Sequence, residues 1–409
     1  MKRTFLLLAA LLSFSACSSK ELTCAADQHV CSNACASLQS DVRNCGACGN
    51  VCGAAQGCSA GACVDCATSP GVCTAEVAVA CGNLNQVRLL RSDLTLADPP
   101  LPTDDRPISF ARIGSDLFVA NSTTSSVSHI GLSPPSSTAG AQAIAIPTTF
   151  PDIEHLQAHG GLLWASNAGA NTLVTIDPTL GTVRQEITLP PGPFGANPQG
   201  LDFVGSKGYL ALAGINAVAV LDASNALAVT VAPNTIDLSG LAAAGAQALP
   251  SRVLAAGTRV YVSLNHLDAS FNAVANGRLA VIDATSDQVV GSPVDLGSAC
   301  LNPSGMALSG TTLWVACGFH LFNSSDVTGA ALVPVDVSGS APVVGTPIPL
   351  GAHAAGAVAV CDGKGYAGAN ESGTAIAFDP VARTVIGTSL ACPTDPGKAS
   401  AVFDIACVR

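Results

Sequence analysis

The sequence predicts an all-β fold preceded by a small disulfide-rich module, and three observations lead to this. Only 11% of the 409 residues are charged and 4% are aromatic, although 48% are hydrophobic. The 40 glycines and 25 prolines interrupt runs rich in Ala, Val and Leu, which is the pattern of short strands joined by turns. Eleven of the 17 cysteines fall between residues 24 and 81, a density typical of a segment that folds through cross-links.

The charge balance and the apolar content argue against two classes of protein, nucleic-acid-binding proteins and long disordered chains. A formal net charge of −11 argues against a nucleic-acid-binding protein, because such proteins need a basic face to replace the counterions of the phosphates. The high apolar content argues against a long disordered chain. We therefore expect folded domains and no nucleic-acid partner.

Residues 1–16 have the three parts of a bacterial export signal. Lys2 and Arg3 are basic, Phe5–Leu12 is apolar, and Ser13–Ala16 ends in small residues. The apolar run is too short to span a bilayer as a mature helix. The sequence therefore predicts export.

Cys17 follows these small residues directly, which resembles the lipobox of bacterial lipoproteins. Phe14 stands where that motif usually has Leu. The resemblance implies lipid attachment at Cys17, and Ser18, rather than Asp, implies sorting to the outer membrane, facing the periplasm or the cell surface. Lipidation would leave 16 cysteines, an even number that suits complete pairing. The alternative is an ordinary secretory signal, with Cys17 in a disulfide.

After a linker at 17–23, we expect a disulfide module over residues 24–66. The cysteine spacing around Asn44-Cys45-Gly46 and Cys48-Gly49-Asn50 resembles a cysteine-rich repeat of exported myxobacterial proteins. The segment has almost no large apolar residues, so it needs cross-links to fold. Zinc at Cys45-x2-Cys48 is the competing interpretation, although export favours disulfides.

Residues 67–409 contain a unit that recurs roughly every 50 residues, a period typical of propellers. The clearest copy alternates apolar and polar residues in four strands, which we place at Glu154–Ala158, Leu162–Asn167, Thr172–Asp177 and Val183–Leu189. Six complete units begin near Pro107, Asp152, Pro198, Pro250, Pro303 and Ala354. The third strand of five units ends in Asp, at 177, 222, 283, 336 and 379, for which we expect turn and capping roles.

The second strands include Tyr261-Val262-Ser263-Leu264-Asn265, and the third strands include Val174-Thr175-Ile176-Asp177. These segments resemble the YVTN-type β-propeller repeat of bacterial surface proteins. The resemblance implies that each unit is one four-stranded blade.

The remaining segments predict a seventh blade shared by the two ends of the domain. We expect its strands, in order, at Ala399–Cys407, Glu76–Cys81, Gln86–Arg91 and Leu94–Leu101. Such a shared blade closes the ring and leaves no open edge between first and last blade. The sequence thus predicts a seven-bladed β-propeller.

Closure of the ring by the shared blade also predicts disulfides within the propeller. Cys300 precedes a first strand and Cys317 ends the next second strand, and Cys392 and Cys81 hold the equivalent positions of the shared blade. We therefore expect Cys300–Cys317 and Cys81–Cys392. A third bridge, Cys73–Cys407, would replace the missing hairpin of the shared blade, which leaves Cys66–Cys361 as the fourth.

The chain offers few groups for catalysis. His155, His266, His320 and His353 all fall near strand ends that should open on one face of the propeller. A metal or acid–base cluster there is one interpretation, and exposed loop histidines are the other. The segment Gly363–Gly368 matches G-x-G-x-x-G, but it lies in a strand–turn–strand and not before a helix. We expect no cofactor, no metal and no catalytic set.

Two functional hypotheses follow. The first is a monomeric, non-enzymatic lipoprotein, attached to the membrane by its N-terminal lipid, that binds a protein, peptide or glycan through loops such as His266–Gly277 and Phe319–Gly329. The second is a lactonase-like hydrolase or a lyase with its site at the central opening, by analogy with other propellers. A structural role in the cell envelope is a third, weaker idea.

Overall fold

The computed structural model describes residues 29–65 and 75–408, with several gaps. The gaps are at 32–33, 37, 40–43, 54–55, 93, 95, 98, 133–134, 193–194, 319–327, 352, 354 and 394–400. The chain divides into two compact units, Met1–Cys73 and Thr74–Arg409, and each is described by itself. In the parts of the chain that are described, no helix is both long enough and apolar enough to cross a membrane.

The first unit consists of two short hairpins held by disulfides. Strand β1 (His29–Cys31) pairs with β2 (Ala34–Ala36), and β3 (Gln56–Ser59) pairs with β4 (Ala62–Asp65). Among its described residues, disulfides join Cys31 to Cys48, Cys45 to Cys58 and Cys52 to Cys63. Cys45, Cys52 and Cys58 form its small buried cluster. The cross-links thus stand in for an apolar core.

The same bridges settle the zinc alternative for this unit. The sulfur atoms of Cys45, Cys52 and Cys63 lie within 4.8 Å of one another, close enough to suggest a metal site. All three are oxidised, as is Cys48, so none provides the thiolate that zinc requires. The motif Cys45-x2-Cys48 is therefore part of a disulfide framework.

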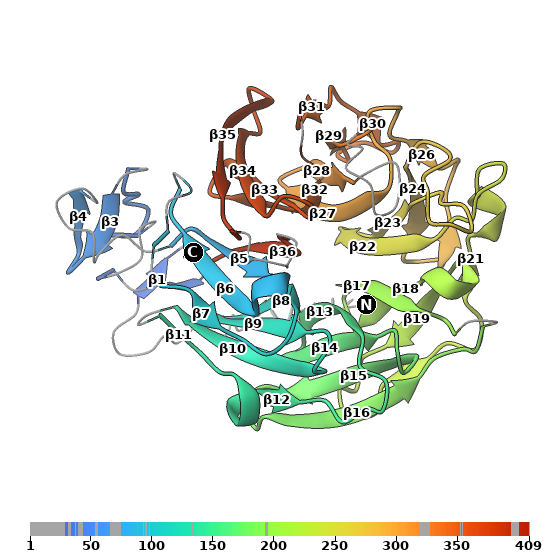
Figure 1. The fold of residues 1–409 in the computed structure, drawn as a ribbon, viewed down its shortest axis with the longest axis horizontal. Helices are drawn as coiled ribbons and strands as arrows, with labels where there is room; N and C mark the ends of the chain where they lie inside the picture. Colours follow the sequence, from blue (N-terminus) through green and yellow to red (C-terminus); the bar gives the residue numbers. More distant parts are fainter. Residues whose placement is uncertain are drawn as a thin grey trace, which may run out of the picture. The chain divides into compact units, whose positions relative to one another are not determined.

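The second unit is a seven-bladed β-propeller (Figure 1), which confirms the predicted fold. Each blade is a sheet in which consecutive strands pair antiparallel. The first strands of six blades are β8 (Pro107–Ile113), β13 (Ile153–His159), β17 (Pro198–Val204), β22 (Pro250–Ala256), β27 (Pro303–Ser309) and β32 (Ala355–Cys361).

The second and third strands of these blades are buried along almost their whole length. The second strands are β9 (Asp116–Asn121), β14 (Leu162–Asn167), β18 (Lys207–Leu212), β23 (Arg259–Leu264), β28 (Thr312–Cys317) and β33 (Lys364–Ala369). The third strands are β10 (Ser126–Leu132), β15 (Thr172–Asp177), β19 (Ala217–Asp222), β24 (Arg278–Asp283), β29 (Ala331–Asp336) and β34 (Thr374–Asp379). Both faces of these strands meet neighbouring blades, which explains the scarcity of charged residues.

The outermost strands differ from blade to blade. Two are seven residues long, β16 (Thr182–Thr188) and β35 (Thr384–Leu390). Four are divided into two short pieces, which are β11 (Pro135–Ser137) with β12 (Ile144–Ala145), β20 (Thr230–Val231) with β21 (Ile236–Asp237), β25 (Gln288–Val289) with β26 (Val294–Asp295), and β30 (Val343–Val344) with β31 (Ile348–Pro349). The described 3-10 turns are η2 (Gly82–Leu84), η3 (Gly140–Gln142), η4 (Ala213–Ile215) and η5 (Ser239–Leu241).

The seventh blade joins both ends of the unit, as predicted. Its order is β36 (Asp404–Cys407), β5 (Val77–Cys81), β6 (Gln86–Leu90) and β7 (Leu101–Pro102). The fourth strand is shorter than the predicted Leu94–Leu101. Leu94 instead has a left-handed backbone, with φ of 65°, and is buried in the core of this blade. A bend that packs an apolar side chain replaces the start of the expected strand.

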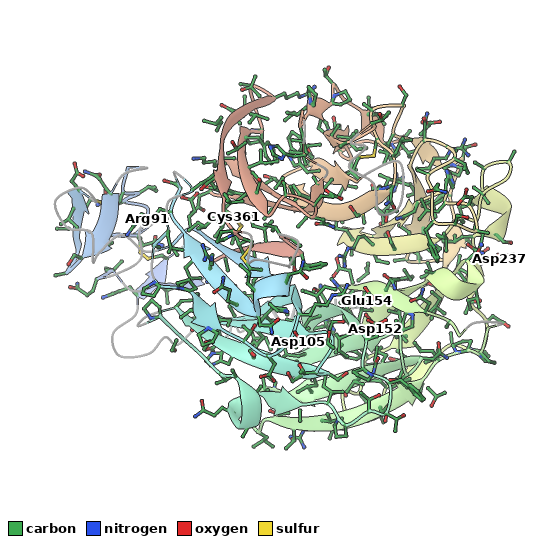
Figure 2. The ribbon with its side chains drawn as sticks, in the orientation of Figure 1. Arg91, Asp105, Asp152, Glu154, Asp237 and Cys361 are labelled. Atoms are coloured by element: carbon green, nitrogen blue, oxygen red, sulfur yellow. A yellow bond between two sulfur atoms is a disulfide. The ribbon has the colours of Figure 1, made fainter. Side chains whose placement is uncertain are left out.

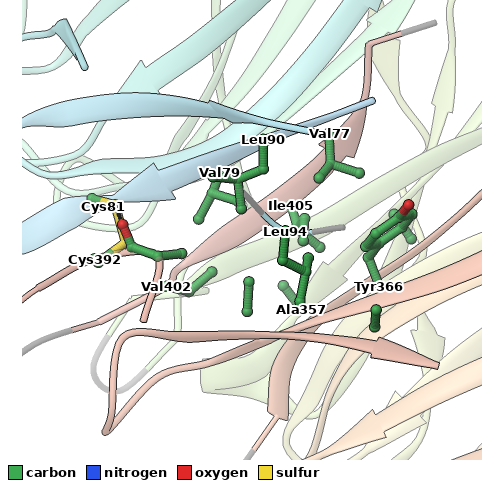
Figure 3. Packing of buried hydrophobic residues seen from close by; sticks show 14 of the residues in the cluster. Val77, Val79, Cys81, Leu90, Leu94, Ala357, Tyr366, Cys392, Val402 and Ile405 are labelled. Atoms are coloured by element: carbon green, nitrogen blue, oxygen red, sulfur yellow. Dashed lines mark hydrogen bonds between the residues drawn. A yellow bond between two sulfur atoms is a disulfide. The ribbon is translucent and has the colours of Figure 1, made fainter. Parts of the chain in front are cut away.

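This core seals the ring where the chain ends meet (Figure 3). Val79 and Leu90 from the start of the unit pack with Val402 and Ile405 from its end, and against Tyr366 of the preceding blade. Similar clusters fill the other blade interfaces. Trp164, for example, packs with residues of the next blade, including Leu201. The stability of the propeller therefore comes from apolar contacts between blades.

Two disulfides of the propeller have the predicted partners, and two predicted pairs are wrong. Cys81 is bonded to Cys392 and Cys300 to Cys317. Cys407 is bonded to Cys361 and not to Cys73, so neither Cys73–Cys407 nor Cys66–Cys361 forms. The reason is topological: Cys361 and Cys407 end the first strands of adjacent blades, whereas the prediction sought a partner within one blade. Cys66 and Cys73 themselves lie outside the described residues.

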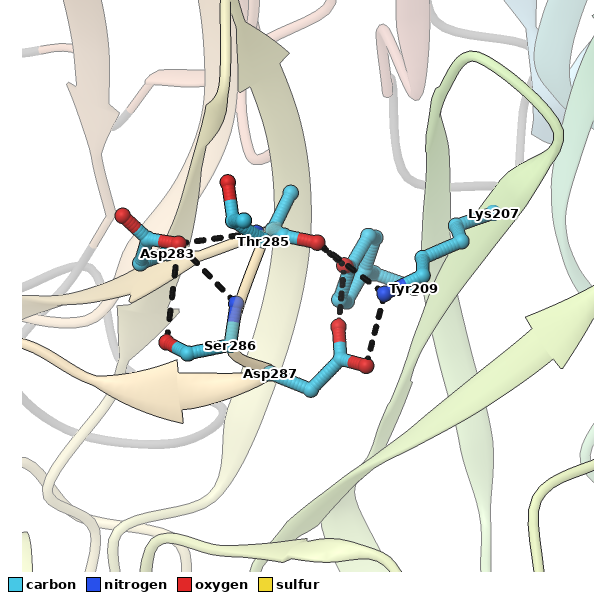
Figure 4. A network of polar contacts seen from close by, with 7 residues as sticks. Lys207, Tyr209, Asp283, Thr285, Ser286 and Asp287 are labelled. Atoms are coloured by element: carbon cyan, nitrogen blue, oxygen red, sulfur yellow. Dashed lines mark hydrogen bonds and ion pairs between the residues drawn. The ribbon is translucent and has the colours of Figure 1, made fainter.

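Polar contacts also tie blades together (Figure 4). The hydroxyl of Tyr209 in β18 donates to Oδ1 of Asp287 at 2.6 Å, and Nζ of Lys207 lies 2.8 Å from Oδ2 of the same carboxylate in the next blade. Asp283 has a different role, because its Oδ1 accepts the backbone N–H groups of Thr285 and Ser286. The equivalent aspartates at 177, 222, 336 and 379 also accept backbone N–H groups one turn later. These repeated aspartates therefore cap turns.

Candidate functional site

A polar cluster lies on the axis of the propeller, where the first strands converge. Each of the six continuous first strands has a β-bulge near its first residues, as between Ile153 and His155 in β13. Bulges re-aim side chains at the rims of β structures. Here the third residues of β8, β13 and β22 are Ser109, His155 and Arg252. Asp404 of β36 holds the equivalent position of the shared blade, because it pairs with Ala80 as Ser109 pairs with Ala120.

His155 is the hub of this cluster. Its Nδ1 lies 3.2 Å from Oγ of Ser109 and 3.3 Å from Nη1 of Arg252. A guanidinium can only donate, so Nδ1 is the unprotonated nitrogen and accepts both hydrogen bonds. The hydroxyl of Ser109 in turn accepts the backbone N–H of Leu156. His155 is therefore a neutral imidazole with a fixed tautomer.

The pKa of His155 agrees with this geometry. Burial, with a further contribution from the positive charge of Arg252, lowers the pKa of His155 to about 3. At neutral pH His155 is thus an acceptor and has no proton to give from Nδ1. Arg252 is held in place by a second hydrogen bond, from Nε to the carbonyl of Ser304 at 2.8 Å.

Two carboxyl groups of the cluster have raised pKa values. Burial, reinforced by Asp152, raises the pKa of Glu154 to about 7, against the opposing attraction of Arg252 and Arg106. Burial likewise raises the pKa of Asp404 to about 6, although its oxygens accept the backbone N–H groups of Phe110 and Ile405. Glu154 and Asp152 project near the middle of the ring (Figure 2). Near neutral pH, the cluster therefore contains a carboxyl group that gains or loses a proton readily.

The space on the axis is small. A cavity of about 80 Å³ is lined by the polar side chains of His155, Arg252 and Asp404 and by small residues that include Gly305 and Gly356. Gly305 is required by packing, because a Cβ there would lie 2.8 Å from the carbonyl oxygen of Gly356 in the next blade. A cavity of this size holds a few water molecules and is far smaller than the roughly 300–1,000 Å³ of a usual ligand pocket. The polar axis therefore contains a small, partly open cavity.

The other predicted histidines do not join His155. His266 is fully buried at φ of 51°, and its Nδ1 donates to the carbonyl of Asn276 at 2.8 Å, so it holds the loop between β23 and β24. Nδ1 of His353 lies 3.1 Å from Oγ of Ser372. His320 lies outside the described residues. Within the described part, the only group of three ligand-type residues at metal-binding distance is the oxidised cysteine set of the first unit.

The axial residues that sequence reasoning missed are Ser109, Arg252 and Asp404, together with Glu154 as a titrating group. The sequence contains one weak signal for this axial cluster. The third residues of the six first strands are Ser109, His155, Gly200, Arg252, Gly305 and Ala357, so two ionisable residues stand among small ones. Because a bulge shifts the alternation of inward and outward residues, period-two reasoning does not assign this position to the axis.

The loop between β23 and β24 forms a second candidate site, on the side of the blades where His155 lies. Oδ1 of Asp268 accepts the backbone N–H groups of Ser270 and Asn272 at 2.8 and 2.9 Å, which folds the loop on itself. Phe271 and Val274 remain 54% and 47% exposed. Val274 also lines a pocket of about 510 Å³, together with Asp268, Asn272, Ala273, Ala275, Asn276 and Leu301. An ordered loop with exposed apolar groups beside a pocket is suited to recognition.

Comparison with known proteins identifies the architecture alone. No protein-family model matches the chain, and no curated protein matches it. Among solved structures, hydrazine synthase of Kuenenia stuttgartiensis is 18% identical over 67% of this chain and 76% of that chain, with a TM-score of 0.52. Virginiamycin B lyase of Staphylococcus aureus is 15% identical over 69% and 83%, with a TM-score of 0.51. A Bacteroides uniformis protein provisionally named a 6-phosphogluconolactonase is 10% identical over 82% and 99%, with a TM-score of 0.59. Identities this low establish a shared propeller fold and nothing about activity.

Proposed function

We propose that this chain is an exported, lipid-anchored binding protein whose propeller recognises a protein, peptide or glycan at the cell envelope through its loops. The observation that carries the proposal is the loop between β23 and β24, where Phe271 and Val274 are exposed and Val274 lines a pocket of about 510 Å³. The axial cavity, at about 80 Å³, is too small for such ligands. The loop is also internally braced, by Asp268 and by His266, so binding would cost little ordering.

The binding proposal is tested with arrays of bacterial glycans and of peptides. The purified protein should bind a restricted set of array members. The double variant Phe271→Ala, Val274→Ser should bind them at least about tenfold more weakly, because truncated central anchors typically cost more than 1 kcal/mol. Leu227→Ala, which removes another exposed apolar side chain from the turn after β19, is the matched control. Equal binding by the double variant and the control would reject the loop as the site.

The anchoring proposal rests on Cys17 and the export signal before it. In a bacterial expression host, radioactive palmitate should label the wild type and not Cys17→Ser. The wild type should sediment with outer membranes, whereas the variant should be released as a soluble protein. Label that persists in Cys17→Ser would defeat the assignment, because the thiol is the attachment point.

A hydrolase or lyase is the second candidate, and the raised pKa of Glu154 is the observation in its favour. A carboxyl group with a pKa of about 7 beside Arg252 and His155 is poised for proton transfer. Assays with lactones and uronic-acid glycans, together with metal analysis, test this candidate. Turnover abolished in both Glu154→Gln and His155→Ala, with folding retained, would favour the enzyme over the binding protein.

A further inference from the structure

The outer edges of the seven blades differ in how well they resist pairing with another strand. An outermost strand has unpaired N–H and C=O groups, and proteins protect such edges by shortening, breaking or charging them. Five blades have short edges: β7 has two residues, and the other four are divided into pieces of two or three residues. Only β16 and β35 among the described outer strands are seven residues long.

Strand β16 is protected by charge. It contains Arg184 and Glu186, and Nη2 of Arg184 lies 2.5 Å from Oδ2 of Asp177 at the end of the neighbouring strand β15. A strand docking against β16 would have to strip water from these charges, which is costly. This edge is therefore a poor template for pairing.

Strand β35 has the same geometry without the charges. Thr384 pairs with Asp379 as Thr182 pairs with Asp177, and both strands have a bulge two residues later. This register places Ile386 where β16 has Arg184, and Thr388 where β16 has Glu186. The bulge is common to both strands, so charge is what distinguishes the two edges.

The β35 edge is also apolar and open. Val381 in the preceding turn is 89% exposed, and Ile386 and Leu390 are 56% and 55% exposed. No atom lies within 4 Å of the place that a Cβ on Gly387 would occupy, so the middle of the strand has free space around it. The stretch Thr384–Leu390 has no ionisable side chain in a chain whose net charge is −11.

We propose that the β35 edge binds the β35 edge of a second copy of this chain, in a symmetric antiparallel pair. Two copies meet at this edge without contact between like charges, although the chain as a whole is strongly acidic. Because the other described outer strands are short, divided or charged, the pairing is available once per chain. It therefore closes as a two-fold dimer and does not continue into a filament.

The size of the edge sets the strength of the dimer. One strand from each copy buries less than the roughly 1,200–2,000 Å² of a stable interface, so the dimer is weak and depends on concentration. From the sequence we expect a monomer. The length of β35 and its exposure, on which the dimer rests, cannot be read from residues 384–390.

Sedimentation velocity of the purified propeller-containing chain between about 1 and 200 µM tests the proposal. The wild type should shift from monomer to dimer over this range. The variant Ile386→Arg places a guanidinium on β35 at the position that Arg184 has on β16, facing Asp379 as Arg184 faces Asp177. It should weaken association of the two copies at least about tenfold and leave the melting temperature unchanged. Val343→Arg, an identical change at an exposed residue of the short strand β30, should dimerise like the wild type.

Hydrogen exchange gives an independent reading of the same interface. Amides of Thr384–Leu390 should exchange more slowly at high than at low concentration in the wild type, and equally at both in Ile386→Arg. The proposal would be overturned by a wild type that stays monomeric over the whole concentration range. The same holds if β35 binds an uncharged extended peptide while the chain remains monomeric. An Ile386→Arg variant that dimerises as strongly as the wild type would also overturn it.

Discussion

Nη1 of Arg252 in β22 lies 3.3 Å from Nδ1 of His155 in β13, which joins two blades that are not adjacent in the ring. The blade that begins with β17 stands between them. The contact therefore crosses the interior of the propeller and fixes both the charge and the tautomer of the imidazole. Together with burial, which is the larger cause, this contact keeps the pKa of His155 low and the imidazole neutral.

Removal of this contact should raise the pKa of His155. In Arg252→Gln the positive neighbour is gone, while burial, the larger cause of the low pKa, remains. The pKa should rise above about 3 and stay below that of an exposed histidine. Nitrogen-15 NMR of the imidazole measures this directly, with the exposed Arg112→Gln as control. An unchanged His155 titration in Arg252→Gln would show that Arg252 has no electrostatic effect there.

Glu154→Gln should stabilise the protein at neutral and alkaline pH but not near pH 4.5. The folded-state pKa of Glu154, about 7, is above the ordinary value of 4.5, so its protonated form stabilises the fold at low pH and that contribution is lost as pH rises through 7. Gln resembles the protonated acid. The variant should match the wild type near pH 4.5 and exceed its unfolding free energy by about 1–3 kcal/mol near pH 8.5.

Urea unfolding at both pH values measures the Glu154 effect. Glu186→Gln on β16 removes an exposed carboxylate and should show no such dependence on pH. A Glu154→Gln variant that is less stable than the wild type at pH 8.5 would contradict a raised pKa.

Loss of the closing disulfide should cost more than loss of the local one. Cys81 and Cys392 are 311 residues apart, whereas Cys300 and Cys317 are 17 apart. The chain-entropy model gives about 5–6 and about 3 kcal/mol for these separations. The Cys361–Cys407 bridge also holds the closing blade, which reduces the difference. We expect the Cys81→Ala, Cys392→Ala double variant to be about 1–2 kcal/mol less stable than the Cys300→Ala, Cys317→Ala double variant, as measured by urea unfolding. Equal losses would argue that closure depends on packing alone.

Tyr209 and Asp287 should be energetically coupled across their blade interface. Hydrogen bonds to charged groups contribute about 1.5–3 kcal/mol, and Lys207 would still neutralise Asp287 after Tyr209→Phe. A double-mutant cycle with Tyr209→Phe and Asp287→Ala, read by urea unfolding, should give a coupling of about 1 kcal/mol or more. Strictly additive losses would mean that the 2.6 Å contact does not stabilise the folded state.

The sequence predicts the repeated parts of this molecule well. Five blades have the same turn after their third strand, so Asp177, Asp283 and their equivalents can be recognised as caps. The spacing of the six complete units also reveals the shared seventh blade. Cys81 and Cys392 can be paired because they occupy slots that Cys317 and Cys300 occupy elsewhere. In each case a repeated unit elsewhere in the chain shows where the residue lies in its blade.

Features that depend on contacts between different blades are not predictable in this way. Cys361 meets Cys407 because the first strands of two adjacent blades end side by side, and no first strand of the other five blades ends in a cysteine. The axial cluster brings together Ser109, His155 and Arg252 from three blades, after bulges that hide the inward alternation. The loop held by His266 depends on a left-handed backbone at that residue, which the alternation of strand residues does not predict.

The shared blade imposes an order on biosynthesis. Strand β5 leaves the ribosome early, but its partner β36 is among the last segments to be made, so the ring stays incomplete until the chain is nearly finished. Throughout that interval Cys81 has no native partner, because Cys392 lies 311 residues later in the chain, and the cysteines of the first unit are its nearest neighbours in sequence. The native bond therefore forms late in folding, and any earlier bond of Cys81 to another cysteine has to be exchanged before the ring can be cross-linked.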